Sequence, residues 1–402
     1  MATDDPCDFL EDKELLEEMK EAMNKSHAEG AAKIQEYLER QNNIPLNIGI
    51  TGETGSGKST FVNAFRGVDN KDEGAAPTGA VETTMEPTAY PHPNYPNVLL
   101  WDLPGVGTIK FPADEYLKHV EFEKFDFFII ISDTRFREND VKLAQEIERM
   151  GKKFYFVRSK IDHNLRDEKE SQREFNEERT LAQIRENCIQ GLEKQGVKSP
   201  QVFLVSSRRL HLYDFKRLEE TLERELPAHK RNALLFAMPN INLEIINKKK
   251  KALQAGIKYR AFASAAIASA PVAGLSFATD VTMLADAVLM YQVTFGLDCK
   301  SLQNLAHSAS VPLDDLIAVM TSPLAGKEIS KELIVKLLAL SAGEVALMAA
   351  EEGSRFIPLF GIPIAMSLSF LSTYRVLNTF LDMLAEDAQR VFKRALGLNT
   401  SV

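Results

Sequence analysis

The chain has 402 residues, which exceeds one typical domain, so we expect two domains that each bury a substantial core. A formal net charge of −9 gives no sequence-wide basic footprint for nucleic acid, so any phosphate binding must be local. Three widely spaced cysteines without a CxxC pair suggest neither a disulfide framework nor a zinc site, and they fit a reducing, cytoplasmic compartment.

Within the first 227 or so residues the sequence changes from a helical pattern to an alternating one. Residues 10–40 are rich in Glu, Lys, Leu and Met at helical spacing, which predicts one or two amphipathic helices. From residue 44 to about 227, short apolar runs alternate with helical or turn-rich segments, which predicts an α/β fold with a doubly wound, mostly parallel sheet. The apolar runs are residues 46–51, 98–102, 127–131, 154–157 and 202–205.

The last part of the chain has no β pattern. From residue 235 onward Ala, Leu, Ile and Met dominate, which predicts an all-helical domain at 231–402 after the α/β domain at 41–230. Residues 261–279 and 356–374 carry no charge and are each about long enough to cross a bilayer. Their many small residues and interrupting prolines favour a buried helical pair, with insertion into a membrane surface and a spanning hairpin as alternatives.

Residues 50–60, ITGETGSGKST, fit the phosphate-binding loop pattern between a predicted strand and a predicted helix. Glycines at three positions let successive N–H groups turn toward a polyphosphate at a helix N-terminus. We expect Lys58 to neutralise the β and γ phosphates and the Ser59 hydroxyl to bind Mg²⁺. The alternative is a Gly-rich turn with a chance lysine. The expected nucleotide contacts in this loop are Gly52, Glu53, Thr54, Gly55, Ser56, Gly57, Lys58, Ser59 and Thr60.

The next predicted strand ends in Trp101-Asp102-Leu103-Pro104-Gly105. An aspartate at the carboxyl end of a strand can hold Mg²⁺, and the N–H of the glycine can sense a γ phosphate. Asp-x-x-Gly also marks ordinary turns, but its place about 45 residues after the loop favours the nucleotide reading.

A third motif, residues 156–162 (FVRSKID), predicts the base site. Asp162 can accept hydrogen bonds from N1 and the exocyclic amino group of guanine, which favours GTP over ATP, with Lys160 beside it. Ser159 stands where the usual guanine motif has Asn or Thr, and a plain surface turn is the alternative. Ser207, after the last predicted strand, is expected to close over the base.

The stretch from residue 74 to residue 85 is rich in Gly, Thr and small residues, as a mobile loop is. In a GTPase a threonine of this first switch completes the Mg²⁺ site and closes on the γ phosphate. Thr78, Thr83 and Thr84 are all candidates, with Gly79 beside the nucleotide, and a plain Thr-rich loop is the alternative.

One residue type is missing. Val106 and Gly107 follow Gly105, so no Gln stands there to position the attacking water. We therefore expect slow unaided hydrolysis of GTP to GDP, completed by groups from elsewhere in the chain or from a second molecule.

Taken together, these residues resemble the immunity-related, interferon-inducible GTPases of vertebrates. The resemblance covers nearly the whole chain and is dense to about residue 231. It is carried by residues 51–59 (TGETGSGKS), 73–76 and 82–85 (EGAA and ETTM), 101–105 (WDLPG), 127–132 (FFIIIS), 155–158 (YFVR), 226–231 (LPAHKR), 295–298 (FGLD), 380–382 (FLD) and 386–388 (EDA).

The resemblance implies a Ras-like P-loop G domain and an all-α helical domain built from both ends of the chain, with residues 1–40 packing against the C-terminal helices. It further implies GTP-dependent self-association, with copies of this chain or other family GTPases, on intracellular membranes in cell-autonomous immunity. Glu82 matches a family glutamate implicated in hydrolysis across a dimer, and Thr78 and Thr84 match switch threonines, so the implied catalytic set is Lys58, Glu82, Thr78 and Thr84, with Ser59, Thr78 and Asp102 around the metal. The N-terminus has Ala2 where myristoylation requires glycine, so membrane contact is expected to be peripheral. A nucleotide-dependent binding switch with slow hydrolysis and a membrane-remodelling scaffold without a defence role are the alternatives.

Overall fold

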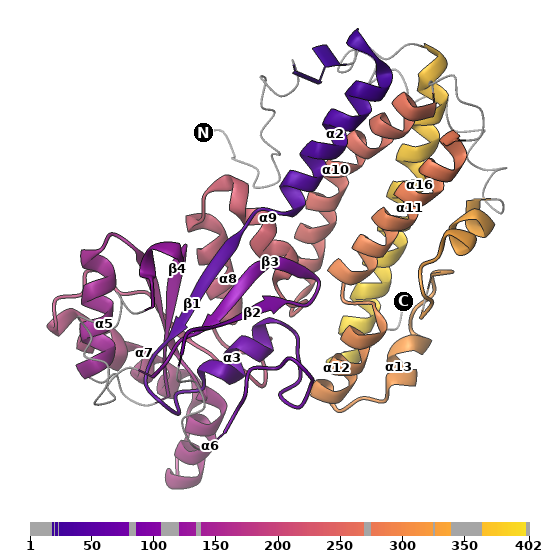
Figure 1. Ribbon diagram of the computed structural model, residues 1–402. Coiled ribbons are helices and arrows are strands. Elements are labelled where there is room, and N and C mark those ends of the chain that lie inside the picture. Colours follow the sequence, from indigo (N-terminus) through magenta and orange to yellow (C-terminus); the bar gives the residue numbers. More distant parts are fainter. Residues whose placement is uncertain are drawn as a thin grey trace, which may run out of the picture. The chain divides into compact units, whose positions relative to one another are not determined.

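The computed structural model describes residues 18–19, 21–22, 24–79, 86–105, 120–133, 138–268, 275–324, 326–338 and 364–398. The chain divides into two compact units, one comprising Met1–Ile44 with Asn242–Val402 and the other Pro45–Ile241 (Figure 1). The expected boundary at residue 230 falls inside helix α9, Ala228–Ala237, which belongs to the second unit.

The unit Pro45–Ile241 is built on a six-stranded sheet in the order β2-β3-β1-β4-β5-β6. All neighbouring strands run parallel except β2 and β3, and helices cover both faces (Figure 1). The predicted doubly wound, mostly parallel sheet is confirmed. Its strands are β1 Leu46–Thr51, β2 Thr88–His92, β3 Tyr95–Asp102, β4 Phe127–Ser132, β5 Lys153–Arg158 and β6 Val202–Leu204, and its helices are α3 Lys58–Phe65, the 3₁₀ turn η1 Phe122–Lys124, α5 Glu138–Arg149, α6 Ile161–Ser171, α7 Glu177–Lys194, α8 Phe215–Glu225 and α9.

The apolar runs become the central strands because both faces of the sheet are covered. Every residue of β4, FFIIIS, is buried. On one face Phe128 and Ile130 pack with residues of α5 and α7. On the other face Phe61 and Phe65 of α3 meet Phe215 of α8 at ring-centroid distances of 6.2 Å. The core is therefore split into two layers by the sheet.

The sequence prediction omitted strand β2 and began β3 three residues late. The segment TAYPH of β2 has no apolar run, and Thr88 is exposed. Pro91 provides no N–H for the sheet, and the register shifts between Pro91 and His92. This edge strand exists because β3 offers a partner, which no local pattern reveals.

The other unit is helical. Helix α10 packs against both α2 and α16, so segments from the two ends of the chain share one core. Tyr37 of α2 and Tyr259 of α10 meet at 5.4 Å between ring centroids. The predicted helical domain built from both ends of the chain is confirmed. Its helices are α2 His27–Asn42, α10 Leu243–Ala268, α11 Leu275–Thr294, α12 Cys299–Ala309, α13 Leu313–Ala318 and α16 Ile364–Ala395.

The structure describes only part of each of the two uncharged segments, residues 261–279 and 356–374. Residues 261–266 belong to α10 and are buried in the helical core, as the buried-helix interpretation expects. Residues 269–274 and 356–363 lie outside the described residues, and α16 begins at Ile364. Within the described part of the chain, no helix is both long and apolar enough to cross a membrane.

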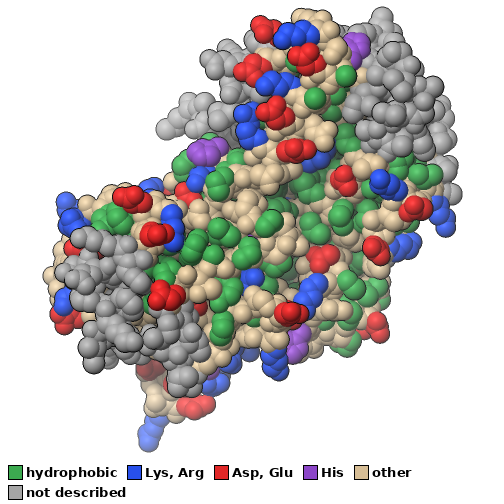
Figure 2. Space-filling model, viewed as in Figure 1, with side chains coloured by type: hydrophobic (Ala, Val, Ile, Leu, Met, Phe, Trp, Pro, Cys, Tyr) green, Lys and Arg blue, Asp and Glu red, His purple; other side chains and the backbone are tan. Residues whose placement is uncertain are grey.

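The basic run at residues 248–251 is engaged inside this unit. Lys249 is buried and donates to the Thr294 carbonyl at 3.0 Å, and Lys250 forms an ion pair of 2.7 Å with Asp382. Basic and acidic side chains are interspersed at the end of the molecule where α2 lies (Figure 2), and within α2 the charged groups of Lys33 and Glu36 are 3.8 Å apart. These charges are paired locally and form no basic patch on α2.

The packing of β1 against β4 predicts the cost of one added methyl group. A Cβ at Gly49 would lie 2.7 Å from Cδ1 of Phe128, whose ring packs on Phe125. We expect Gly49→Ala to lower the free energy of unfolding by about 1–3 kcal/mol through overpacking. The measurement is urea unfolding followed by tryptophan fluorescence, because Trp101, the only tryptophan of the chain, pairs with Gly49 across β1 and β3. Thr88→Ala on the exposed edge strand serves as the control, and an equal midpoint for both variants would contradict the prediction.

Candidate nucleotide-binding site

The candidate site lies where the parallel strands end, in the turn that joins β1 to α3. Gly52 opens this turn with φ +135°. A Cβ there would lie 2.1 Å from the Ile131 carbonyl oxygen of β4, so only glycine fits. Gly57 caps α3 in the left-handed conformation, with φ +98°. The loop therefore curls over the N-terminus of α3, where N–H groups without helical partners favour an anion.

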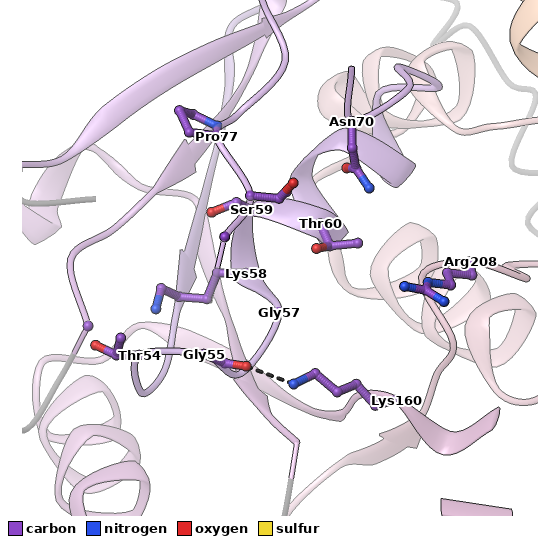
Figure 3. A pocket seen from close by; sticks show the side chains of 13 residues that line it. Thr54, Gly55, Gly57, Lys58, Ser59, Thr60, Asn70, Pro77, Lys160 and Arg208 are labelled. Atoms are coloured by element: carbon purple, nitrogen blue, oxygen red, sulfur yellow. Dashed lines mark hydrogen bonds between the residues drawn. The ribbon is translucent and has the colours of Figure 1, made fainter. Parts of the chain in front are cut away.

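A cavity of about 340 Å³ opens above this loop. Figure 3 shows Lys58, Ser59 and Thr60 on its floor, Pro77 and Asn70 above them and Lys160 with Arg208 to one side. The predicted residues that line it are Thr54, Gly55, Gly57, Lys58, Ser59, Thr60, Thr78, Gly79, Gly105 and Lys160. Three lining residues were not predicted: Asn70, Pro77 and Arg208.

Other predicted residues lie outside the cavity lining. Gly52, Glu53 and Ser56 form the loop beneath it, and Asp102 stands behind Ser59. Two residues predicted for the base site, Asp162 and Ser207, do not line the cavity. Glu82, Thr83 and Thr84 lie outside the described residues.

Two lysine side chains donate hydrogen bonds to carbonyl groups of the phosphate-binding loop. Lys58, only 7% exposed, donates from Nζ to the carbonyl oxygens of Gly52 at 3.1 Å and Glu53 at 3.0 Å. Lys160 donates from Nζ to the Gly55 carbonyl at 2.8 Å (Figure 3) and to Asp133 at 2.7 Å. These bonds hold two ammonium groups at the loop and stabilise the loop without a ligand.

Ser159 completes this set of contacts. Its hydroxyl donates to the Ser56 carbonyl at 2.7 Å and lies 3.3 Å from the Ser132 carbonyl of β4, while its own N–H bonds Ser132 at 2.8 Å. The serine that departs from the usual guanine motif thus ties that motif to the phosphate loop. A hydroxyl is the only group that this contact requires.

Arg158 orients the helix that carries Asp162. Its guanidinium, which is largely buried, donates to Asn164 Oδ1 at 2.7 Å, and burial lowers its pKa. Asp162 stands in the first turn of α6, with its carboxylate 3.8 Å from His163 Nε2. The structure thus places Asp162 one turn from the Ser159 anchor.

Ser59 and Asp102 provide hard oxygen ligands at one point. The Ser59 hydroxyl donates to Asp102 Oδ2 at 2.5 Å, and Asp102 is fully buried at the end of β3. Mg²⁺ is usually bound through one or two carboxylates, a hydroxyl, water and substrate phosphates, not by a cage of protein ligands. This donor set fits Mg²⁺, and the described residues hold no cluster of three His, Cys, Asp or Glu for another kind of metal centre.

Gly105 packs directly on the phosphate loop. A Cβ at Gly105 would lie 2.2 Å from Oγ1 of Thr54 and 3.0 Å from its backbone nitrogen. The end of β3 and the phosphate loop can approach this closely only because position 105 has no side chain.

Of the three residues that sequence reasoning missed, Arg208 carried a usable signal. It follows Ser207 directly after the last strand, at the edge of the sheet where the other motifs end. Asn70 reaches the cavity through the course of the loop after α3, which has no local signature at that point, whereas Pro77 directly precedes Thr78 in the stretch expected to form the first switch.

Strand order, the β1–α3 loop and the Ser59–Asp102 contact define a Ras-like P-loop G domain. The profile described as Interferon-inducible GTPase (IIGP) matches residues 12–395. The chain belongs to this interferon-inducible GTPase family, as the sequence resemblance predicted, and it is a GTPase of an immunity-related family.

Individual relatives agree with this assignment over nearly the full chain. Interferon-inducible GTPase 5 of Rattus norvegicus is 42% identical over 96% of this chain and 83% of that protein. Interferon-gamma-inducible GTPase 10 of Mus musculus is 40% identical, over 89% and 83%. Interferon-inducible GTPase 1 of Mus musculus is 38% identical, over 90% and 85%.

The Ser159 bridge generates a prediction. Ser159→Ala leaves the buried Ser56 carbonyl without this donor, so we expect a loss of about 0.5–1.5 kcal/mol in stability and faster release of GDP. Ser159→Thr keeps the hydroxyl and should retain slow release. The measurement is the dissociation rate of a fluorescent GDP, with Ser171→Ala, whose hydroxyl bonds only within exposed α6, as the control. Equal rates for Ser159→Ala and the control would contradict this role of Ser159.

Proposed function

We propose that the unit Pro45–Ile241 binds GTP with Mg²⁺ in the described cavity and hydrolyses it to GDP and phosphate. The observation that carries this proposal is a cavity lined by Lys58 and Ser59 on one side and by Lys160 and Arg208 on another, with Asp102 bound to the Ser59 hydroxyl behind the lining. The polyphosphate contacts come from the loop at Gly52, Glu53, Thr54, Gly55, Ser56, Gly57 and Thr60, with Thr78, Gly79 and Gly105 facing the γ phosphate.

Each polar group has a separate task in this reaction. Lys58 holds the β and γ phosphates and offsets the negative charge that develops between them. Ser59, Thr78 and Asp102 would hold Mg²⁺, which would supply positive charge to neutralise the phosphates. Water attacks the γ phosphorus, the bond to the β–γ bridging oxygen breaks, and GDP and phosphate leave.

Asp162, Lys160 and Ser207 select the base. The two carboxylate oxygens of Asp162 accept from N1 and the amino group of guanine. The Lys160 ammonium lies on the Gly55 carbonyl, so its aliphatic stem runs from the base motif to the phosphate loop. Binding of the base therefore requires Asp162 and Ser207 to close on the cavity that Lys160 lines.

Base selection predicts a switch of ligand. In Asp162→Asn an amide N–H faces the amino group of guanine, whereas xanthine offers a carbonyl there, so we expect the preference for guanine over xanthine to fall at least about 100-fold. The measurement is competition of GDP and xanthosine diphosphate for a fluorescent nucleotide. Asp167→Asn, an exposed residue of the same helix, is the matched control. Unchanged selectivity in Asp162→Asn would show that the base site is misassigned.

We further propose that a second protomer completes catalysis. The chain has Val106 and Gly107 where a Gln would orient the attacking water, and Glu82 matches a family glutamate implicated in hydrolysis across a dimer. GTP-dependent self-association, with other family GTPases as further partners, then controls the rate. A switch that hydrolyses slowly without a partner is the competing mechanism.

This mechanism predicts how turnover depends on concentration. Specific activity with GTP should rise as protein is raised, because the active form is a dimer or larger oligomer. Glu82→Ala should keep nucleotide affinity and lose the rise, and Lys58→Ala should lose at least about 100-fold in turnover because the phosphate charge is no longer offset. The measurement is phosphate release over a range of protein concentrations, and a flat specific activity in the wild type would support the slow switch instead.

The site of assembly is proposed to be the surface of intracellular membranes, reached from the cytoplasm by peripheral contact. This proposal is supported by the membership of the interferon-inducible GTPase family and not by the two uncharged segments, since residues 261–266 and 370–371 of those segments are buried in the helical core. Flotation with phosphatidylserine-containing vesicles tests it, because the vesicles should carry the protein with them in the presence of GTP. The turnover series is repeated with the same vesicles. No flotation in GTP, in GDP or without nucleotide would remove the membrane component and leave the turnover result intact.

A further inference from the structure

Asn63 of α3 is a fully buried amide that no nucleotide motif includes. Its Oδ1 accepts from the Ala76 N–H at 2.7 Å. Its Nδ2 donates to the Ala76 carbonyl at 2.9 Å and to Asn70 Oδ1 at 2.9 Å. Both amide hydrogens and the amide oxygen are therefore used, and Ala76 is bound through both of its main-chain polar groups.

Asn63 lies on the same face of α3 as the proposed metal ligand. Ser59, Asn63 and Arg66 stand at positions i, i+4 and i+7, which fall on one side of a helix. Arg66 anchors the same loop a second time, donating to the Gly74 carbonyl at 3.1 Å and to the Pro91 carbonyl of β2 at 3.0 Å. One rigid helix face thus carries Ser59 and both anchors of the loop.

The anchored loop forms one wall of the cavity. Asn70, Pro77, Thr78 and Gly79 all line it, and Figure 3 shows Asn70 and Pro77 on the side of the cavity above Ser59. Ala76 is fully buried and immediately precedes Pro77 and Thr78. Because Pro77 restricts the backbone, fixing Ala76 also fixes the point from which Thr78 enters the cavity.

We propose that Asn63 is a positioning residue that sets Thr78 against Ser59, so that the described start of the first switch, residues 74–79, is already in place before GTP binds. The inference rests on the proposed function, since it assigns to Thr78 a contact with the metal and the γ phosphate. A wall ordered during folding costs no conformational entropy when the nucleotide binds. This ordering should raise the affinity for GTP more than the affinity for GDP, because the switch contacts depend on the γ phosphate and GDP has none.

Asn63→Asp removes the donors and keeps the size of the side chain. A carboxylate oxygen then faces the Ala76 carbonyl and Asn70 Oδ1, two acceptors, while the other oxygen still accepts from the Ala76 N–H. We expect affinity for a slowly hydrolysed GTP analogue with Mg²⁺ to fall about tenfold, and affinity for GDP to stay within about twofold. Fluorescent nucleotide titration of the full chain measures both.

Two further variants separate positioning from general stability. Val62→Ala opens a cavity beside Asn63 in the buried core of α3 and leaves the amide contacts intact. At an equal loss of melting temperature, it should weaken GTP analogue and GDP alike or not at all. Arg66→Lys removes the guanidinium that donates to the Gly74 and Pro91 carbonyls. It should reproduce the selective loss of affinity for the GTP analogue, with a smaller magnitude.

The outcomes are distinguishable. An equal loss for both nucleotides in Asn63→Asp, or the same selective loss in Val62→Ala, overturns the role of Asn63. If Asn63→Asp does not fold, Arg66→Lys decides by the same criterion. Failure of the wild type to bind the GTP analogue more tightly than Lys58→Ala contradicts the proposed function itself, and not only the inference about Asn63.

Discussion

A phosphate-binding loop that turns its N–H groups toward an anion turns its carbonyl groups away from it, and those carbonyl groups need other hydrogen-bond partners. In this protein the carbonyls of Gly52 and Glu53 accept from Lys58, the Gly55 carbonyl accepts from Lys160, and the Ser56 carbonyl accepts from Ser159. Lys160 and Ser159 come from the guanine motif, about 100 residues away in the sequence. The segment with the guanine motif and the phosphate-binding loop are therefore one hydrogen-bonded structure, so loss of either anchor is expected to change both segments.

Helix α3 places a second set of groups in the same way. Its first turn presents Ser59 to Asp102 at the end of β3, and its next turns hold the loop that leads to Thr78 through Asn63 and Arg66. The parallel sheet brings the ends of β1 and β3 to one edge, and α3 sets the spacing of what lies above that edge. Ser59 and the anchors of the loop that leads to Thr78 are thus held by a single short helix. This helix packs on Phe215 through Phe61 and Phe65.

The sequence predicted the parts of this arrangement that depend on local chemistry. Apolar runs such as residues 127–131 identify buried strands, because a strand covered on both faces is apolar at every position and does not alternate with polar residues. Gly52 and Lys58 were identified because the turn requires particular residues at particular spacings. Strand β2 was missed since it pairs only through β3, and Asn70 and Arg208 were missed because a loop and a strand end bring them to the cavity from other parts of the chain.

Ser159 shows why a departure from a motif needs structural context. From sequence it weakened the case for guanine, because the usual motif has Asn or Thr at that position. In the structure the Ser159 hydroxyl donates to the Ser56 carbonyl, a contact that a threonine hydroxyl could also make. Lys58, Lys160 and Arg208 line the cavity, and no carboxylate is among its described lining residues, although the whole chain has a net charge of −9. Attraction of a polyphosphate thus depends on where a few cations are held, and the hydrogen bonds of Lys58 and Lys160 to the loop carbonyls are what hold two of them in place.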